Sequence, residues 1–214
     1  MNITVFGGTG RTGRNFVTQA IAAGYQTTVL VRDLARAKSL LPDSKKLILI
    51  EGDVLDPDSI KKAITPETEL VFSALSTDKQ NVLSRSIGHI LSRIEEATTA
   101  DFAAISTAGI LNARHEAGKY RFQSSESKRK STEAAKDHLT VYERLKESSI
   151  GWILFCPTYI LDGPAKGPVV WEFDLLPEGV RQITPESIAA FAFENICNTS
   201  FHSRRIGIGE KTEQ

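Results

Sequence analysis

The stretch Asn-Ile-Thr-Val-Phe-Gly-Gly-Thr-Gly-Arg-Thr-Gly-Arg, residues 2–14, decides the fold of this chain. Ile3, Val5 and Phe6 suit a short buried strand, the next seven positions hold four glycines, and the apolar residues that follow have the spacing of a helix lying on a sheet. A strand, a glycine turn and a helix predict a phosphate site. The bare backbone of the turn can approach a pyrophosphate, and the helix N-terminus favours its negative charge.

The glycines of this turn fit two known patterns. Gly8-x-Gly10-x-x-Gly13 is the common dinucleotide fingerprint, and Gly7-x-x-Gly10-x-x-Gly13 is the version of extended and atypical short-chain dehydrogenases. Both patterns predict that the turn holds the pyrophosphate of a dinucleotide. The residues concerned are Gly7, Gly8, Thr9, Gly10, Arg11, Thr12 and Gly13.

Strands and helices alternate along the rest of the chain. Apolar, β-branched runs predict strands at 27–31, 47–50, 70–74, 102–105, 152–155 and 205–208, with helical patterns between most of them. This alternation is typical of an α/β doubly wound parallel sheet, the Rossmann fold, in a single domain over residues 1–214.

Ligands of such a sheet bind outside the carboxyl ends of its strands. We therefore expect the glycine turn to share one crevice with the residues that follow the other strands: Arg32, Asp53, Val54, Ser73, Ala74, Leu75, Ser106, Pro157 and Thr158. Asp53 has two interpretations, since its carboxylate could accept a hydrogen bond from the adenine amino group or only cap its turn.

The choice between NAD and NADP depends on the end of the second strand, about 20 residues after the glycines, where an acid selects NAD and an arginine accommodates the 2′-phosphate of NADP. The sequence offers Arg32 followed by Asp33. We predict NADP, because Arg32 comes first after the strand and Asp33 suits the N-cap of the next helix. Arg11 and Arg36 could add positive charge.

The composition indicates an ordinary soluble protein. Lys plus Arg equal Asp plus Glu at 26 each, so no overall charge attracts nucleic acid or an anionic membrane. Cys156 and Cys197 show no metal-ligand or disulfide pattern, no apolar run is long enough to span a bilayer, and the first strand leaves no room for a signal peptide. We expect a cytoplasmic protein without nucleic-acid or membrane partners, either monomer or homodimer.

Two irregular segments, 106–126 and 156–183, interrupt the alternation. A helix is expected to begin near Ser127 and to run to Lys146. The irregular segments carry several aromatic side chains that could form a substrate pocket over the nicotinamide, although ordinary packing of loops onto the core is an equal alternative. These aromatics are Tyr120, Phe122, Tyr159 and Trp171.

Several motifs together resemble the atypical short-chain dehydrogenases with an NAD(P)H-binding domain, in particular the flavin reductases, also called biliverdin-IX-beta reductases, and their NmrA-like relatives. The motifs are Phe6-Gly-Gly-Thr-Gly-Arg-Thr-Gly13, Val29-Leu-Val-Arg-Asp33, Glu51-Gly-Asp-Val54, Ser106-Thr-Ala-Gly109 and Leu145-Lys-Glu-Ser148 through Pro157-Thr. The resemblance implies an NADPH-dependent reductase that delivers hydride to a flat, electron-poor acceptor such as a flavin, a quinone or a tetrapyrrole. It also allows an NmrA-like redox sensor that binds NADP without turnover.

The resemblance names two candidate catalytic residues. Ser106 corresponds to the serine near the nicotinamide, and Tyr142 falls where the flavin reductases have an active-site histidine. Tyr142-x-x-x-Lys146 also spells the pair in which a short-chain dehydrogenase tyrosine donates a proton. Counted back from Pro157, however, the family's catalytic lysine and tyrosine fall near His138 and Ala134. We therefore treat Tyr142 as a candidate proton donor. The alternative is that the Tyr-x-x-x-Lys pattern arises by chance on a solvated helix.

Overall fold

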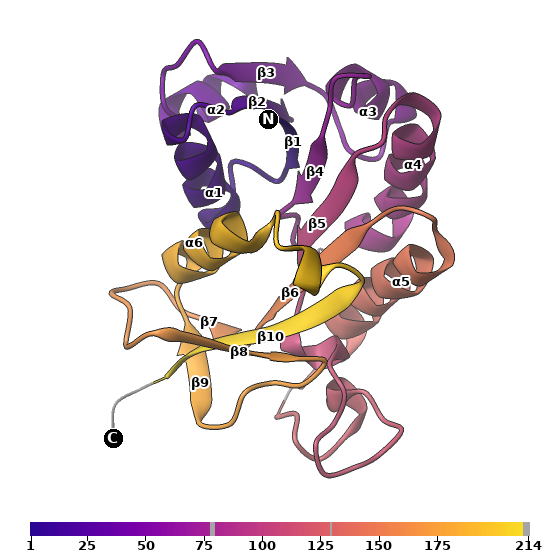
Figure 1. Ribbon diagram of the computed structural model, residues 1–214, viewed down its shortest axis with the longest axis vertical. Helices are drawn as coiled ribbons and strands as arrows, with labels where there is room; N and C mark the ends of the chain where they lie inside the picture. Colours follow the sequence, from indigo (N-terminus) through magenta and orange to yellow (C-terminus); the bar gives the residue numbers. More distant parts are fainter. Residues whose placement is uncertain (78–79, 129, 212–214) are drawn as a thin grey trace.

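A parallel sheet forms the centre of the computed structural model, which describes residues 1–77, 80–128 and 130–211 (Figure 1). The strands lie in the order β3-β2-β1-β4-β5-β6-β10, all parallel, as the sequence predicted for a doubly wound Rossmann domain. Their bounds are β1 Asn2–Phe6, β2 Gln26–Val31, β3 Leu47–Glu51, β4 Leu70–Ser73, β5 Asp101–Ile105, β6 Trp152–Pro157 and β10 Arg204–Lys211.

Helices cover both faces of this sheet (Figure 1). On one face α1 (Arg11–Ala22), α2 (Leu34–Leu40) and α6 (Pro185–Asn195) pack over a core in which Phe16 stacks on Phe72 of β4, with ring centroids 3.6 Å apart. On the other face lie α3 (Pro57–Ala63), α4 (Val82–Ala97) and α5 (Glu133–Glu147). With both faces covered, the central strands are mostly buried, which is why their sequences are largely hydrophobic; Thr4 and Ser73 are buried polar exceptions.

The segment 156–183 contains three strands that the sequence did not predict. β7 (Tyr159–Ile160) pairs with β9 (Val180–Ile183), and both β9 and β8 (Val169–Phe173) pair antiparallel with β10. The parallel sheet therefore continues into a small antiparallel extension. The glycines and prolines that precede β8 suggested a loop, while its pairing depends on a strand more than 30 residues further along the chain.

The start of α5 is a second correction. The helix begins at Glu133, with Thr132 as N-cap, and not near Ser127. Residues just before it are held in turns instead: the carboxylate of Glu116 accepts hydrogen bonds from the backbone N–H and the hydroxyl of Ser125, both at 2.7 Å. Residue 129, within the predicted helix, lies outside the described residues.

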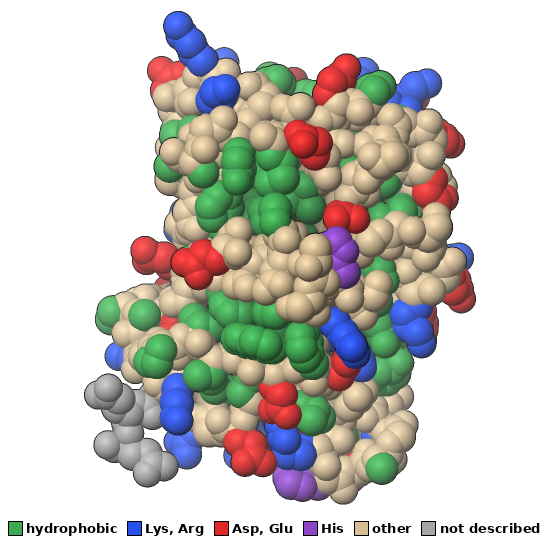
Figure 2. Space-filling model, viewed as in Figure 1, with side chains coloured by type: hydrophobic (Ala, Val, Ile, Leu, Met, Phe, Trp, Pro, Cys, Tyr) green, Lys and Arg blue, Asp and Glu red, His purple; other side chains and the backbone are tan. Residues whose placement is uncertain are grey.

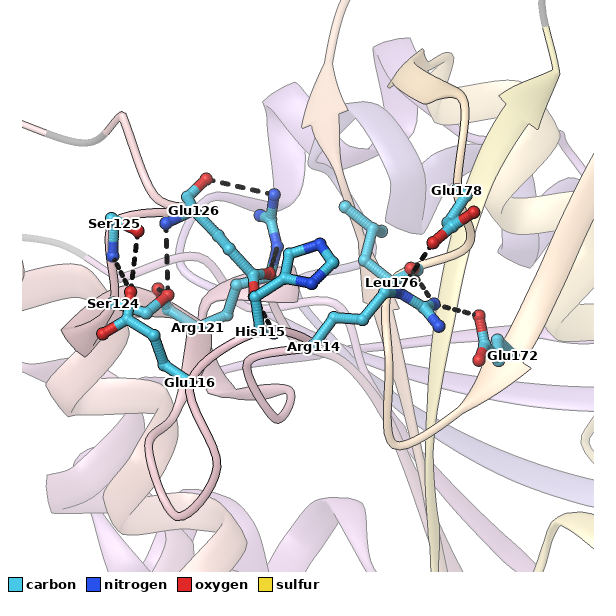
Figure 3. Close-up of polar contacts among 10 residues, drawn as sticks. All are labelled: Arg114, His115, Glu116, Arg121, Ser124, Ser125, Glu126, Glu172, Leu176 and Glu178. Carbon is cyan, nitrogen blue, oxygen red and sulfur yellow. Dashed lines mark hydrogen bonds and ion pairs between the residues drawn. The ribbon is translucent and has the colours of Figure 1, made fainter.

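The irregular segment 106–126 is fixed to the antiparallel extension by charged side chains. Arg114 forms ion pairs with Glu172 of β8 and with Glu178, and donates to the backbone carbonyl of Leu176 at 3.0 Å (Figure 3). Arg205 of β10 is buried, bonds Asp174 at 2.8 Å and donates to the carbonyl of Ile110. Short 3₁₀ turns at Ala108–Ile110 and Arg121–Gln123 are its only helical pieces among the described residues.

Candidate functional site

A cavity of about 370 Å³ opens at the carboxyl ends of β1, β2, β3 and β4, where the sequence predicted the dinucleotide. Its lining contains eight of the predicted cofactor residues: Gly7, Thr9, Gly10, Arg32, Asp53, Val54, Ala74 and Leu75. Residues that the sequence analysis did not assign to the cofactor complete it, among them Phe6, Leu30, Gly52, Ser76 and Val82. Four of the six stretches that were expected to share one crevice therefore line this cavity, whereas Ser106, Pro157 and Thr158 do not.

The glycines of the turn have different tasks. Gly7 has φ +75°, a conformation that favours glycine, and its Cα lies so close to β4 that an added Cβ would stand 2.6 Å from the carbonyl of Ala74. Gly13 faces back into the turn, where an added Cβ would overlap the carbonyl oxygen of Gly7. Gly8 is buried against Val29, while Thr9 and Gly10 face the cavity. Gly8 and Gly13 thus shape the turn, and Gly7, Thr9 and Gly10 present it to a ligand.

The N-terminus of α1 is arranged to receive an anion. Its N-cap is Gly10, which supplies no side-chain cap, and the first turn carries no acidic residue. The neighbouring helices α2 and α3 begin instead with capping carboxylates, from Asp33 and Asp56. A helix start without a cap leaves backbone N–H groups and the positive end of the helix dipole facing the cavity. The residues present therefore fit the pyrophosphate of a dinucleotide.

Positive charge gathers at the end of β2. Arg32 and Arg36 are exposed, line the cavity, and form no ion pair within the part of the chain that the structure describes. Asp33 accepts a hydrogen bond from the backbone N–H of Arg36 at 2.9 Å, so its predicted capping role is confirmed. Two guanidinium groups thus lie beside this end of the cavity, next to Asp33.

Asp53 and Asp56 have turn and cap contacts. Asp53 accepts from the backbone N–H of Leu55 at 2.9 Å, which is the capping interpretation of that residue, while it still lines the cavity. Asp56 accepts from Ser59 at 2.6 Å through the hydroxyl, and hydrogen bonds from Ser59 and Asp58 lower the pKa of its carboxyl. Gly52 is needed here because a Cβ would run into Ser59.

Ser106 and Ser73 line a second, much smaller cavity of about 20 Å³, which shares Leu75 with the first. Here Ser106 Oγ lies 3.3 Å from Nδ1 of His138, a buried residue of α5, and the tautomer of the ring decides which atom donates. The structure thus brings Ser106, predicted to lie near the nicotinamide, together with a histidine for which we had predicted no role. Counting back from Pro157 had marked position 138, but it did not predict that the residue would contact Ser106.

Tyr142 follows His138 by one turn of α5 and packs mainly against other residues. Because α5 runs antiparallel to β5 and β6, Tyr142 is one helical turn, about 5 Å, further toward the amino ends of these strands. Its ring packs against Trp152 at 5.7 Å, and the guanidinium of Arg205 lies 4.4 Å from its centroid. Burial raises the pKa of its hydroxyl. Its role as a proton donor stays a prediction, and neither cavity described above includes it.

The remaining predicted residues lie at the border of the crevice. Arg11 pairs with Asp162 at 3.0 Å, which connects the glycine turn to the segment after β7. Thr158 follows the buried Pro157, and its N–H donates to the carbonyl of Ile208 at 3.1 Å. Thr12 is half-buried in the first turn of α1. The segment 156–168 therefore borders the turn from the side of β6.

The aromatic residues of the irregular segments do not share one pocket. Tyr120 and Phe122 stack at 6.2 Å and lie near Tyr142, whereas Trp171 packs on Phe173 and Phe201. A groove of about 610 Å³ separates Asn112–Tyr120 from Phe173–Leu175, at the amino end of β10. Tyr159 is 68% exposed beside Pro157–Thr158. A pocket over the nicotinamide built from both segments stays a prediction.

The geometry defines an NAD(P)H-binding Rossmann protein, and comparison with known proteins agrees. The model of the NAD(P)H-binding family matches residues 7–199, and the chain belongs to this family. Two curated relatives match only segments of the chain. A photosystem II assembly factor of Cyanophora paradoxa is 43% identical over 65 residues, 30% of this chain and 20% of that protein. An uncharacterized chloroplast protein of Arabidopsis thaliana is 32% identical over 73 residues, 34% of this chain and 26% of that protein.

Solved structures match over nearly the full length, at identities that establish the fold alone. A short-chain dehydrogenase/reductase of Veillonella parvula in complex with NADP has a TM-score of 0.76 and 18% identity, covering 98% of this chain and 94% of its own. A proposed NADH-flavin reductase of Streptococcus pneumoniae has a TM-score of 0.80 and 19% identity, and the match covers 99% of this chain and 100% of that one. An anaerobilin reductase of Escherichia coli O157:H7 has a TM-score of 0.79 and 16% identity, and the match covers 100% of this chain and 99% of that one.

Two features are absent from the residues that the structure describes. None of their helices has the length and apolar character needed to cross a membrane. In the same residues, no three side chains of His, Cys, Asp or Glu are grouped as metal ligands would be.

Proposed function

We propose that the protein is an NADPH-dependent reductase that transfers hydride to a flat, electron-poor acceptor such as a flavin, a quinone or a tetrapyrrole. The observation that carries this proposal is the position of two cavities along the strand ends. The larger one lies at the glycine turn, and the small one, whose lining also includes Leu75, is lined by Ser106 after β5 and by His138 of α5. Two proteins of the same fold, a proposed NADH-flavin reductase and an anaerobilin reductase, support it.

The cofactor is proposed to be NADP because of the charges at the end of β2. Arg32 and Arg36 would hold the 2′-phosphate, and Asp33 is occupied by the cap of α2. The glycine turn and the N-terminus of α1 would hold the pyrophosphate. When bound, NADPH supplies the hydride.

Ser106 and His138 are proposed to orient and protonate the acceptor. The Ser106 hydroxyl can donate to a carbonyl or ring nitrogen of the acceptor while His138 Nδ1, at 3.3 Å, holds that hydroxyl in position. Reduction of a flavin or quinone needs little further acid catalysis, since the cofactor carries the hard chemistry and the protein positions it.

Oxidation of NADPH, followed by its absorbance, tests the reaction with a panel of flavins, quinones and linear tetrapyrroles. Turnover with at least one acceptor is expected. Tight NADP binding without turnover on any acceptor would contradict the proposal and would fit a redox sensor of the NmrA-like kind.

Two variants test the assigned residues. Arg32→Ala is expected to weaken NADPH binding by about 10- to 100-fold, the loss of one charge-assisted hydrogen bond, and NADH binding far less. Arg144→Ala, on the exposed side of α5, is the control. Equal losses for both cofactors would refute the assignment to NADP.

Ser106→Ala and His138→Asn should lower kcat by similar factors. The double variant should be no slower than the slower single variant, because two residues that act as a unit are not additive. Additive losses would show that the contact at 3.3 Å does not couple the two side chains during the reaction.

A further inference from the structure

β8 is an outer edge of the sheet, and its free side consists of regularly spaced backbone groups. Among the described residues β8 pairs only with β10. At its two ends Asp174 N–H donates to Arg205 O at 2.7 Å, and Lys211 N–H donates to Pro168 O at 3.0 Å. In an antiparallel ladder hydrogen-bonded pairs alternate with non-bonded ones. The N–H and C=O groups of Val169, Trp171 and Phe173 therefore point away from β10.

The side chains of the same three residues form an apolar face. Trp171 packs on Phe201 at 4.9 Å and on Phe173 at 5.0 Å, yet 44% of Trp171 stays exposed. Figure 2 shows apolar side chains gathered over β8 and β10 on this side of the molecule. The edge thus offers both unpaired backbone groups and an aromatic surface next to them.

The usual protections of an edge strand are weak here. Lysine, proline and bulges normally discourage pairing at an edge, and β8, Val-Val-Trp-Glu-Phe, has no lysine or proline. Its one charge, Glu172, forms an ion pair with Arg114 of the same chain. At the other edges β7 has only two residues, and β3, Leu-Ile-Leu-Ile-Glu, also has no lysine or proline within its bounds but follows Lys45 and Lys46, as β8 follows Pro168. What distinguishes β8 is the aromatic surface beside its free backbone groups.

We propose that a second copy of this chain pairs antiparallel with β8 through its own β8, about a two-fold axis at Trp171. In this register Trp171 faces Trp171 of the partner subunit, and Val169 faces Phe173 of the partner subunit. The outward groups of the strand then form about six hydrogen bonds. Glu172 lies opposite an apolar valine of the other copy and not opposite a like charge, so the strand is complementary to itself.

The aromatic clusters of the two copies join in this arrangement. The axis is perpendicular to the sheet, so both Trp171 side chains emerge on the same face, about 5.5 Å apart at their Cα atoms. Each tryptophan then covers part of the other's exposed surface. A single sheet runs through both subunits, with the two cofactor crevices at a distance from the contact.

Sedimentation equilibrium of the full chain tests the proposal. The wild-type protein is expected to have twice the mass of one chain, and Trp171→Lys the mass of one chain, because the ammonium groups of two copies would face each other. Ile48→Lys is the matched control: Ile48 is also 44% exposed and also lies on an edge strand, β3. It should remain dimeric. A monomeric wild type, or dissociation by Ile48→Lys and not by Trp171→Lys, would overturn the proposal.

A cross-linking experiment avoids dependence on the lysine variant. The exposed Cys197 is first replaced by serine, and Trp171→Cys is then introduced. Mild oxidation should link two chains through residue 171, and Ile48→Cys in the same background should not be linked. Circular dichroism and NADPH binding confirm that each variant is folded. A folded Trp171→Cys protein that forms no more linked dimer than Ile48→Cys would refute the pairing.

Discussion

Substitution of Gly13 by alanine should damage the glycine turn, while the same change at Gly88 should stabilise the protein. Both glycines lie in helices, Gly13 in α1 and Gly88 in α4. Alanine is favoured over glycine inside a helix by about 1 kcal/mol. At Gly88 an added Cβ meets no atom within 4 Å, so this gain should appear in full.

At Gly13 the added Cβ would overlap the carbonyl oxygen of Gly7 and stand 2.9 Å from its carbonyl carbon. These are backbone atoms, which cannot rotate away, and overpacking of this kind costs about 1–3 kcal/mol. The net change in the free energy of unfolding is then a loss of up to about 2 kcal/mol after subtraction of the helix gain. The two variants should differ by about 1–3 kcal/mol.

The Gly13 variant should also bind the dinucleotide poorly. The Gly7 carbonyl accepts the hydrogen bond from Gly10 N–H at 3.0 Å that closes the turn, so its displacement moves the backbone groups that would hold the pyrophosphate. We expect the Kd for NADPH to rise about tenfold or more, which corresponds to about 1.4 kcal/mol. Urea unfolding and titration of NADPH fluorescence measure the two effects. Equal stability and equal affinity of Gly13→Ala and Gly88→Ala would refute this account of the turn.

Three further predictions concern the second half of the chain. Arg205→Met should lower the free energy of unfolding by about 3 kcal/mol, because it leaves Asp174 without its buried partner. Arg204 is exposed and lies 3.9 Å from the same carboxylate, so Arg204→Met should lower it by less than about 1 kcal/mol. Urea unfolding of both variants measures the difference. Hydrogen bonds from Lys119 and Ser125 lower the pKa of Glu116 from 4.5 to about 2. The contribution of Glu116 to stability is therefore complete above pH 4.5 and is lost as the pH falls through about 2. An NMR titration of Glu116 with a midpoint near 4.5 would contradict this. Tyr142→Phe should keep the stability of the wild type within about 1 kcal/mol in urea unfolding, since the ring contacts remain, and an equal turnover would exclude Tyr142 as proton donor.

The dinucleotide half of the fold could be predicted because its determinants are local. The strands of the first half are mostly apolar runs, α2 and α3 begin with capping aspartates, and the glycine turn lies within seven positions. Asp33 and Asp56 show this directly, since both cap helices as their sequence context indicates. Local determinants of this kind act within one or two turns of chain, where sequence patterns are most reliable.

The contacts around the acceptor side could not be predicted in the same way, because they join residues far apart in the sequence. Ser106 and His138 are 32 positions apart and meet only because α5 packs against β5 and β6. The start of α5 was placed too early, since the turn at Ser124–Glu126 is fixed by Glu116 and Arg121 and not by its own sequence. β8 was missed for the same reason, as its partner is β10.

Two buried charges on β10 carry this long-range organisation, but the sequence does not mark them as buried. Arg205 follows Arg204 and Glu210 precedes Lys211, so both lie beside another charged residue near an end of the strand, and charged groups are buried in proteins only when they are paired or hydrogen-bonded. Arg205 bonds the segment 106–126 through Ile110 and Asn112, and Glu210 accepts the backbone N–H groups of Lys166 and Thr184 at 2.8 and 2.9 Å. Burial opposes ionisation of Glu210, yet these hydrogen bonds outweigh it and lower its pKa. One strand thus holds both irregular segments in place through two buried charges, and the contacts that bury them become visible only in the folded chain.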